Sequence, residues 1–336
     1  MKLGIIGLPL SGRSTTFEAL TRQGGGTAAR GEDRIAMVRV PDERVDRLSR
    51  MFEPQKKIYA QVEYFLPGPG SQKKEANPWL PVKDCDALIH VVRNHGPDRH
   101  PVADFRAVEQ ELILSDLVQV EKRLERIEQD QQRGKKMNTE EHTLLAECRQ
   151  LLESETPLRR RPELADAKPL RGFSLLTAKP VLVVFNNEES DLQLPEIGEL
   201  GEIETCLTLR AQIEQELARM RPEEAAEFLK EYKIGDSAME RMIRLSYEVM
   251  GLIAFFTVGS DEVRAWTIRR GAPAVEAAGV IHSDMQKGFI RAEVIAYEDL
   301  MAAGSTAEAR RRGTFRLEGK TYEVRDGDII NFRFNV

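Results

Sequence analysis

The sequence predicts an α/β protein made of a parallel-sheet domain, a helical insertion in that domain, and a small α+β domain at the C-terminal end. Short apolar runs alternate with helical patterns through the N-terminal part of the chain. A long charged stretch with coiled-coil spacing begins near residue 105, and closely spaced short strands with turn signals begin near residue 252. Alternating strands and helices are typical of a parallel sheet with helical crossovers.

The elements of the sheet domain are predicted from apolar runs and helical spacing. Strands are expected at residues 3–6, 35–40, 59–66, 87–92, 180–185 and 202–209. Helices are expected at residues 17–20, 43–51, 211–220, 223–232 and 237–250, with a loop at 71–83. His90 falls inside one of these strands and is expected in the core, whereas His95 and His100 lie in a loop rich in Gly and Pro.

The charged stretch at residues 105–169 predicts an antiparallel pair of helices. Apolar residues follow the a/d spacing of a coiled coil at Ile113, Leu117, Val120, Leu124 and Ile127. A polar turn follows, and Asn138 with Glu141 resembles a capping box at the start of a second helix. Two interpretations remain open: such a hairpin is either a surface insertion without a binding role or an arm that binds a partner.

The C-terminal part has the pattern of a small α+β domain. Strands are expected at residues 252–258, 263–268, 289–296, 314–317, 321–324 and 329–336. Helices are expected at residues 272–279 and 297–303, and Gly319 and Asp326–Asp328 mark turns.

Composition narrows the classes of function. The net charge of -6 and the pI near 5.7 give no overall attraction to nucleic acid or to an anionic membrane, so such contacts would have to be local. Cys85, Cys148 and Cys206 lack metal-ligand spacing, and their odd number argues against a disulfide framework. Because no apolar run approaches the length of a membrane span, we expect a cytoplasmic protein without a membrane partner.

The stretch from residue 2 to residue 21 carries the clearest functional signal. A strand, the loop GLPLSGRST and a helix follow one another, which is the context in which G-x-x-x-x-G-K-[ST] forms a phosphate cradle. Gly7 and Gly12 hold the glycine positions, and Ser14 stands where a hydroxyl binds Mg²⁺. Arg13 replaces the lysine, and its planar guanidinium is wider than an ammonium group. A purely structural glycine turn is the alternative.

A second polar group is expected at the same edge of the sheet. Asn186 and Glu189 follow the apolar run 180–185, and ligands of open parallel sheets bind beyond the carboxyl ends of the strands. An Asn side chain and a carboxylate three residues later can together contact the edge of a nucleotide base. The alternative is that both residues only cap the turn that follows the strand.

These segments resemble the Obg-like ATPase family, also called YchF, of the translation-factor class of P-loop proteins. The resemblance is carried by GLPLSGRSTTFEALT, by VRVPDERVDRLSRMFEPQKK with YAQVEYF, by CDALIHVVR, by DLVQVEKRLERIE and by FNNEE. It is longest from FFTVGSDEVRAWTIRRGAPAVEAAGVIHSDMQKGFIRAEVIAYEDL to GKTYEVRDGDIINFRFNV, which resembles the C-terminal TGS domain of the family.

The resemblance implies a P-loop NTPase-type domain at residues 1–104 and 170–251, a coiled-coil arm at 105–169, and a β-grasp TGS domain at 252–336. It also implies binding of ATP in preference to GTP, because the base-reading motif is N-x-x-E. The implied ligand of Mg²⁺ is Ser14. The implied nucleotide ligands are Gly7, Pro9, Ser11, Gly12, Arg13, Ser14, Thr15, Asn186, Glu189 and Ala211.

The family's association with ribosomes and RNA is a further implication. Local basic residues would be needed for it, and the candidates are Arg310, Arg311, Arg312, Arg316 and Lys320. A solvated loop is the alternative explanation of the same residues.

The sequence departs from the family pattern where the chemistry takes place. Besides Arg13, Leu66 and Pro69 stand at the Asp and Gly of the second switch, and Arg210 stands where a Ser precedes Ala211. Thr27 is the candidate for the first switch. Phosphoryl transfer depends on positioning and on neutralising charge, so hydrolysis is expected to be weak or lost. Two functions stay open: a nucleotide-dependent switch, or a pseudo-ATPase scaffold that binds a ribosome, RNA or protein partner.

Overall fold

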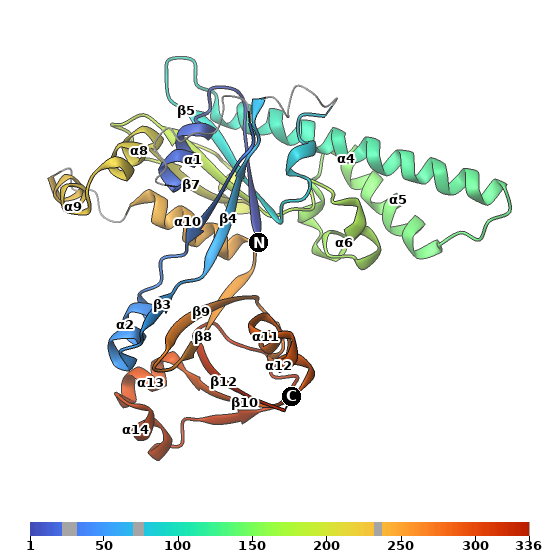
Figure 1. Ribbon diagram of the computed structural model, residues 1–336. Helices are drawn as coiled ribbons and strands as arrows, with labels where there is room; N and C mark the ends of the chain where they lie inside the picture. The colour runs from blue at the N-terminus through green and yellow to red at the C-terminus, as the bar shows by residue number, and fades with distance from the viewer. Residues whose placement is uncertain (22–31, 70–76, 232–236, 336) are drawn as a thin grey trace. The chain divides into compact units, whose positions relative to one another are not determined.

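The computed structural model describes residues 1–21, 32–69, 77–231 and 237–335. The chain divides into two compact units, one formed by Met1–Val38 and Glu63–Met242 and the other by Arg39–Val62 and Ile243–Val336. Each unit has a sheet of its own, as Figure 1 shows. No helix in the described ranges is long and apolar enough to cross a bilayer.

The first unit is built on a sheet with the strand order β2-β4-β1-β5-β6-β7. β1 pairs in parallel with β4 and β5, and β6 pairs in parallel with β5 and β7, which confirms the predicted parallel sheet. The strands are β1 Lys2–Ile6, β2 Arg34–Arg39, β4 Gln61–Leu66, β5 Ala87–Asn94, β6 Val181–Asn187 and β7 Thr205–Leu209.

Burial in the central strands follows from their sequences. Every residue of β6 is buried, as expected for an apolar strand with neighbours on both edges. Val181, Val183 and Phe185 pack with Phe105 and Val108 of helix α4 Pro101–Gln132 in one hydrophobic core. His90 of β5 is 3% exposed and stacks on Phe105 with 5.1 Å between ring centres, so its predicted core position is confirmed.

Shorter helices complete this unit. α1 Arg13–Thr21 and α8 Ala211–Arg219 lie side by side (Figure 1). The remaining helices are α7 Leu200–Ile203, α9 Pro222–Glu231 and α10 Ala238–Val249, the last of which continues into the second unit. The predicted loop at 71–83 contains the short 3₁₀ helix η1 Leu80–Val82, and its residues 71–76 lie outside the described ranges.

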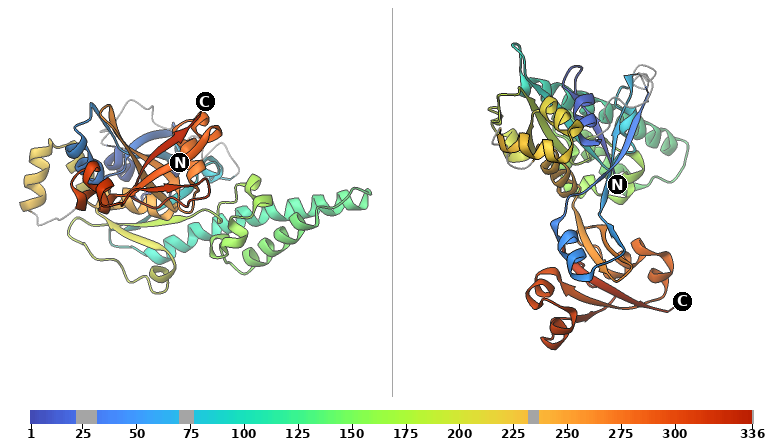
Figure 2. Two further views of the ribbon diagram at one scale, coloured as in Figure 1. Left: turned by 90° about the horizontal axis from the view of Figure 1, so that it is seen from below. Right: turned by 60° about the vertical axis from the view of Figure 1, so that its left-hand side comes forward.

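The helical insertion forms the predicted hairpin. α4 and α5 Thr139–Glu153 run side by side, as the left panel of Figure 2 shows. Their shared core contains the predicted a/d residues Ile113, Val120, Leu124 and Ile127. Asn138 caps α5 by accepting a hydrogen bond from the Glu141 backbone N–H at 3.4 Å. The Glu141 carboxylate is bound by Arg123 at 2.7 Å, so the Asn138 side chain supplies the cap.

The segment that returns from the hairpin is fixed by one buried carboxylate. Asp116 of α4 accepts hydrogen bonds from the backbone N–H groups of Leu176 and Thr177, at 2.9 and 2.7 Å, and from the Thr177 hydroxyl. Burial raises the pKa of Asp116, and these three donors oppose that shift. The returning segment contains η2 Leu158–Arg160, α6 Pro162–Ala165 and η3 Lys168–Phe173.

The second unit has a mixed sheet with the order β11-β10-β12-β8-β9-β3. In this sheet β12 is parallel to β8 and β9 is parallel to β3, whereas β10 is antiparallel to β11 and β12, and β8 is antiparallel to β9. Helix α11 Ala274–Ile281 packs on it through Ala274, Ala277 and Ala278. This arrangement confirms the predicted α+β class. The strands are β3 Lys56–Ile58, β8 Leu252–Val258, β9 Glu262–Arg269, β10 Phe289–Ala296, β11 Arg316–Glu318 and β12 Asp328–Phe334.

Some predicted elements differ from the structure. The strand expected at 59–66 is present as β4 in the first sheet, whereas β3, which pairs with β9 in the second sheet, was not predicted. The strand expected at 321–324 is reduced to one bridge between Pro273 and Glu323. α13 Tyr297–Ala303 was predicted, whereas α12 Ser283–Lys287 and α14 Thr306–Arg311 were not.

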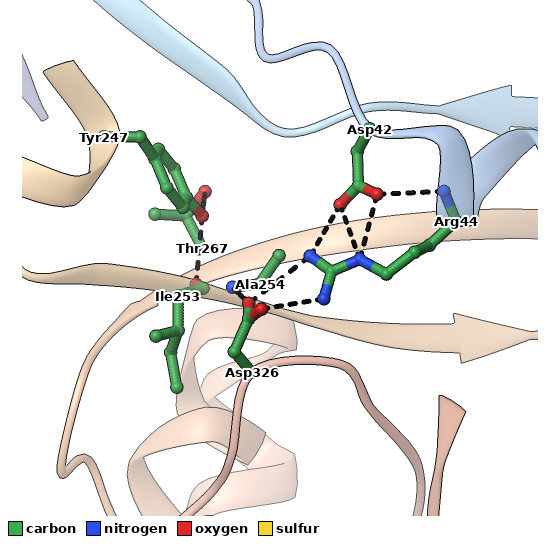
Figure 3. A network of polar contacts seen from close by, with 7 residues as sticks. All are labelled: Asp42, Arg44, Tyr247, Ile253, Ala254, Thr267 and Asp326. Atoms are coloured by element: carbon green, nitrogen blue, oxygen red, sulfur yellow. Dashed lines mark hydrogen bonds and ion pairs between the residues drawn. The ribbon is translucent and has the colours of Figure 1, made fainter. Parts of the chain in front are cut away.

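Residues 39–62 belong to the second unit through a polar network (Figure 3). They form β3 and helix α2 Glu43–Phe52, and Asp42 caps α2. The Arg44 guanidinium donates to Asp42 at 2.8 and 2.9 Å and to Asp326 at 2.7 Å. Asp326 also accepts from the Ala254 N–H of β8 at 2.9 Å, so Arg44 ties α2 to the sheet. The three-domain prediction had placed residues 39–62 in the first domain.

The same view shows how α10 is tied to this sheet. The Tyr247 hydroxyl donates to the carbonyl oxygen of Ile253 at 2.9 Å and lies 3.0 Å from the Thr267 hydroxyl (Figure 3). Burial raises the pKa of Tyr247, so the phenol stays protonated and available as a donor.

Candidate nucleotide-binding site

The loop between β1 and α1 takes a shape that requires glycine at two positions. Gly7 has φ +144°, and a Cβ there would lie 2.2 Å from the Val91 carbonyl oxygen. Gly12 has φ +97°, and a Cβ there would lie 2.2 Å from the Asn186 amide nitrogen. The loop is therefore pressed between β5 and β6, and the glycines allow that close approach.

A pocket of about 850 Å³ opens at the carboxyl edge of the sheet. Most of the residues predicted as nucleotide ligands line it, namely Ser11, Gly12, Arg13, Ser14, Thr15, Asn186, Glu189 and Ala211. Gly7 and Pro9 do not line it. The other lining residues are Leu10, His95, Gly96, Asn187, Glu188, Ser190, Arg210 and Gln212.

Asn186 joins three segments of this pocket. Its side chain is 6% exposed, its amide N–H donates to the Ser11 carbonyl oxygen at 3.0 Å, and its carbonyl oxygen accepts from the Ala211 N–H at 3.1 Å. The side chain therefore holds the phosphate loop against the start of α8. One amide hydrogen and one oxygen lone pair remain for a further contact, because a carboxamide has two donors and two acceptor positions.

The loop after β6 is held by contacts that sequence reasoning missed. Glu188 accepts from the Gly96 N–H at 2.9 Å, and Arg210 donates to the Glu189 carbonyl oxygen at 3.0 Å. Asn187 accepts from the Asn94 amide at 2.9 Å and donates to the Gln193 carbonyl oxygen at 2.7 Å. The run Asn186–Asn187 at the end of a buried strand was the one available signal for the Asn187 contact.

The phosphate loop contains buried polar atoms without partners. The Ser11 hydroxyl, one terminal nitrogen of Arg13 and the Thr16 hydroxyl are buried and make no hydrogen bond to the described residues. Burial lowers the pKa of Arg13, although a guanidinium remains charged at neutral pH. Buried donors without acceptors are costly. Ser11 and Arg13 line the pocket, so a bound anion there would satisfy their donors, whereas Thr16 does not line it.

The groups available for Mg²⁺ at this site are few. Ser14 is exposed at the pocket, and the described residues contain no cluster of three His, Cys, Asp or Glu that could hold a metal ion. Leu66, at the position of the switch carboxylate, is 5% exposed within the sheet core. Mg²⁺ beside phosphates commonly keeps several waters and takes one or two protein ligands, so Ser14 fits such an ion only together with a nucleotide.

The other predicted functional residues do not gather here. Thr27 lies outside the described residues. Burial, with a smaller contribution from Arg159, lowers the pKa of His90 to about 3, which keeps this imidazole neutral. His95 lines the pocket, and His100 precedes α4 as its N-cap residue.

The predicted basic patch of the second unit is largely paired. Arg310 bonds to Glu293 at 2.6 Å, and Arg311 and Arg312 each bond to Glu308 at 2.7 Å. Arg316 lies 3.4 Å from Glu318 and 3.8 Å from Asp328. Neighbouring carboxylates therefore neutralise most of the charge that the sequence displays.

Comparison with known proteins places this geometry in a family. A family model described as YchF-GTPase_C, protein of unknown function (DUF933), matches residues 252–335. The "Ribosome-binding ATPase YchF" of Bacillus subtilis is 37% identical, with 99% of both chains covered. The Escherichia coli O157:H7 protein of the same name is 34% identical over 100% of this chain and 99% of its own.

The similarity extends to eukaryotes and to a solved structure. "Obg-like ATPase 1" of Oryza sativa subsp. japonica is 34% identical over 100% of this chain and 92% of its own. The structure of the Schizosaccharomyces pombe YchF GTPase superposes with a TM-score of 0.82 at 29% identity, covering 99% of this chain and 97% of that one. The chain belongs to the YchF family of Obg-like ATPases.

Proposed function

We propose that the chain binds a nucleoside triphosphate, ATP in preference to GTP, in the pocket at the carboxyl edge of the first sheet. The observation that carries this proposal is the set of unpartnered buried donors on the phosphate loop, above all the Arg13 nitrogen. Phosphate oxygens are acceptors with negative charge, and charge-assisted bonds to arginine are among the strongest hydrogen bonds in proteins.

Each predicted ligand has a place in this proposal. The backbone N–H groups of Gly12–Thr15 and the Arg13 guanidinium hold the phosphates at the start of α1. Ser14 is the protein ligand of Mg²⁺, which would neutralise phosphate charge when bound. Asn186, Glu189 and Ala211 form the base end, where the remaining amide hydrogen of Asn186 and the Glu189 carboxylate contact the base. Gly7 and Pro9 shape the loop.

Hydrolysis is proposed to be weak or lost. Leu66 offers a buried apolar side chain where the resemblance implies a carboxylate linked to Mg²⁺, and Pro69 replaces the glycine that would contact the γ-phosphate. Phosphoryl transfer has little covalent chemistry for the protein to supply, so missing positioning groups cost rate directly.

Association with the ribosome is the second part of the proposal. Its support is the family, whose bacterial relatives carry the name ribosome-binding ATPase. We expect the protein to act in the cytoplasm. Its proposed domains are a nucleotide domain at 1–104 and 170–251, an arm at 105–169 and a TGS domain at 252–336, with residues 39–62 packed into the unit that contains the TGS domain. The paired arginines of the C-terminal unit argue against a purely electrostatic RNA contact there.

Calorimetric titration of the full chain with ATP, GTP and ADP, with and without Mg²⁺, tests the nucleotide site. We expect ATP to bind more tightly than GTP, to bind more tightly with Mg²⁺, and to be turned over slowly in a phosphate-release assay. Absence of binding by every nucleotide at millimolar concentration would overturn the proposal.

The scaffold function is the second candidate, and Leu66 and Pro69 are the observations that favour it. Cosedimentation with ribosomes distinguishes the two. A switch predicts that ATP changes the bound fraction, whereas a scaffold predicts the same fraction with ATP, with ADP and without nucleotide.

A further inference from the structure

A second pocket of the first unit lies outside the nucleotide site. It has a volume of about 780 Å³ and runs along the outer side of α4, opposite residues 77–83. We call it the α4 groove. Its lining residues are Asn77, Pro78, Trp79, Lys83, Glu111, Leu114, Ser115, Val118, Gln119, Lys122, Arg123, Arg126 and Phe173.

The floor of the α4 groove is apolar and uncovered. Leu114 and Val118 are four residues apart and therefore lie on one face of α4, yet they are 61% and 40% exposed. Other faces of the same helix are used in the fold, because Leu112 belongs to the sheet core and Val120 to the hairpin core. Large apolar side chains that remain exposed side by side are typical of interaction sites.

The walls of the α4 groove are fixed before any partner binds. Asn77 donates to the Ser115 hydroxyl at 2.6 Å, and the Trp79 ring N–H donates to Glu111 at 3.0 Å. Gln119 donates to the Phe173 carbonyl oxygen at 2.7 Å and accepts from Lys83. A groove held in this way costs little conformational entropy when it binds.

The rim of the α4 groove is basic. Lys83, Lys122, Arg123 and Arg126 line it, against the single carboxylate of Glu111. Arg123 is paired with Glu141, but Lys122 and Arg126 have no ion pair within 4.0 Å among the described residues. These two cations follow Val118 at steps of four residues, so they continue the face that carries the apolar floor.

We propose that the α4 groove binds an amphipathic helix of a protein partner, with apolar residues on the face that enters the groove and acidic residues toward Lys122 and Arg126. The distance along α4 from Leu114 to Arg126 is about 18 Å, or roughly three helical turns. Leu and Val side chains accept a ridge of apolar residues, which is how helix-in-groove recognition works.

RNA fits this surface less well than a helix does. Single-stranded RNA is held by aromatic side chains that stack on bases, and Trp79 is only 5% exposed, with its ring N–H already bound. Leu114 and Val118 give a nucleic acid neither hydrogen bonds nor a stacking surface. The proposal is independent of the proposed nucleotide function, because the two pockets share no lining residue.

The test is fluorescence anisotropy with the full chain and labelled helical peptides of about five turns, drawn from a designed library. Each peptide has leucines at i, i+4 and i+7 with glutamates at one end. Matched peptides carry lysines in place of the glutamates, or the same residues in scrambled order. An RNA oligonucleotide of the same length is the alternative ligand. We expect the acidic peptides to bind at least about tenfold more tightly than their lysine forms, because charge complementarity selects the partner.

Variants locate the binding surface. Val118→Asp should abolish peptide binding, and the double change Lys122→Glu with Arg126→Glu should reverse the preference toward the lysine peptides. Lys136→Glu, in the turn between α4 and α5, is the matched control and should change nothing. Circular dichroism and ATP titration of each variant verify that the fold and the nucleotide site persist.

The proposal fails if no acidic amphipathic peptide in the library binds, if acidic and basic peptides bind equally, or if Val118→Asp leaves binding unchanged. It also fails if the RNA oligonucleotide binds at this surface more tightly than every peptide.

Discussion

The arginine of the phosphate loop and the arginines of the C-terminal cluster differ in their burial and in their acidic partners. Arg13 is partly buried, and one of its nitrogens has no acceptor among the described residues. Arg310, Arg311 and Arg312 are far more exposed, and each one is bound by a carboxylate. The single Arg13 therefore offers a more available positive charge than the three C-terminal arginines, because nearby Glu side chains pair with those three.

Arg13→Ala is the sharpest test of this comparison. We expect ATP affinity to fall by about 30-fold, ~2 kcal/mol, because a charge-assisted contact to phosphate is lost. Arg13→Lys should retain more than half of that binding energy, since its ammonium keeps the charge. Calorimetric titration measures both, and Arg149→Ala on α5, which pairs only with Glu153 of the same helix among the described residues, is the control. Equal affinity in Arg13→Ala and in the unchanged chain would remove Arg13 from the site.

Gly12→Ala tests the close packing that places Arg13. The new Cβ would meet the Asn186 amide at 2.2 Å in addition to adopting a positive φ. We expect a loss of about 1–3 kcal/mol in the unfolding free energy of the first unit, measured by urea denaturation. Gly134→Ala is the matched control, because its φ is +79° but nothing lies within 4 Å. Equal losses of unfolding free energy in the two variants would show that the close packing of Gly12 against Asn186 does not matter for stability.

His90 extends the comparison to a buried group that is kept neutral. Its folded-state pKa of about 3 lies below the ordinary value of 6.5, so the unfolded chain binds the proton first as the pH falls. Stability from this group is complete above about pH 6.5 and should fall by about 1.4 kcal/mol per pH unit between that pH and the folded pKa. Urea denaturation of His90→Leu should show a shallower acid slope, whereas His142→Gln on α5 should not.

Glu308→Gln is expected to have the smallest effect. Hydrogen bonds from Arg311 and Arg312 hold the pKa of Glu308 at about 2, so the carboxylate is charged throughout the physiological range and offsets one of their two positive charges. Removing its charge should strengthen binding of a single-stranded RNA oligonucleotide by about two- to fivefold at low salt, with a steeper salt dependence. Filter binding measures this, and Glu298→Gln on α13 is the control. An unchanged affinity would mean that the cluster does not contact RNA even when its charge is free.

Sequence reasoning succeeded where one local pattern determines the structure. The apolar runs 87–92 and 180–185 became the buried strands β5 and β6, and heptad spacing gave the α4–α5 hairpin. It missed β3, because nothing local shows that residues 56–58 pair with β9, which is some two hundred residues away in sequence. Pairing across such separations is decided by tertiary packing.

The candidate site shows the same limit. The phosphate loop was visible as a motif, and Asn186 followed from its position at the end of a strand. The contacts Glu188–Gly96 and Arg210–Glu189 join loops that are distant in sequence, so no spacing rule reveals them. The pairing of Arg310 was missed because Glu293 lies on β10, whereas Arg310 lies on helix α14. The pairing of Arg311 and Arg312 with Glu308 follows i,i+3 and i,i+4 spacing, so the sequence did carry that signal.

The pairing of β3 with β9 also determines which fragments of this protein can keep the C-terminal sheet intact. A fragment that starts at Leu252 would lack both β3 and Arg44, so the backbone of β9 would be left as an open sheet edge and Asp326 would lose its guanidinium partner. Open edges recruit other strands, and such a fragment should self-associate unless residues 39–62 are supplied with it. The C-terminal unit is therefore built from two stretches of chain that are distant in sequence, and a transfer of residues 252–336 alone to another protein would leave its sheet incomplete.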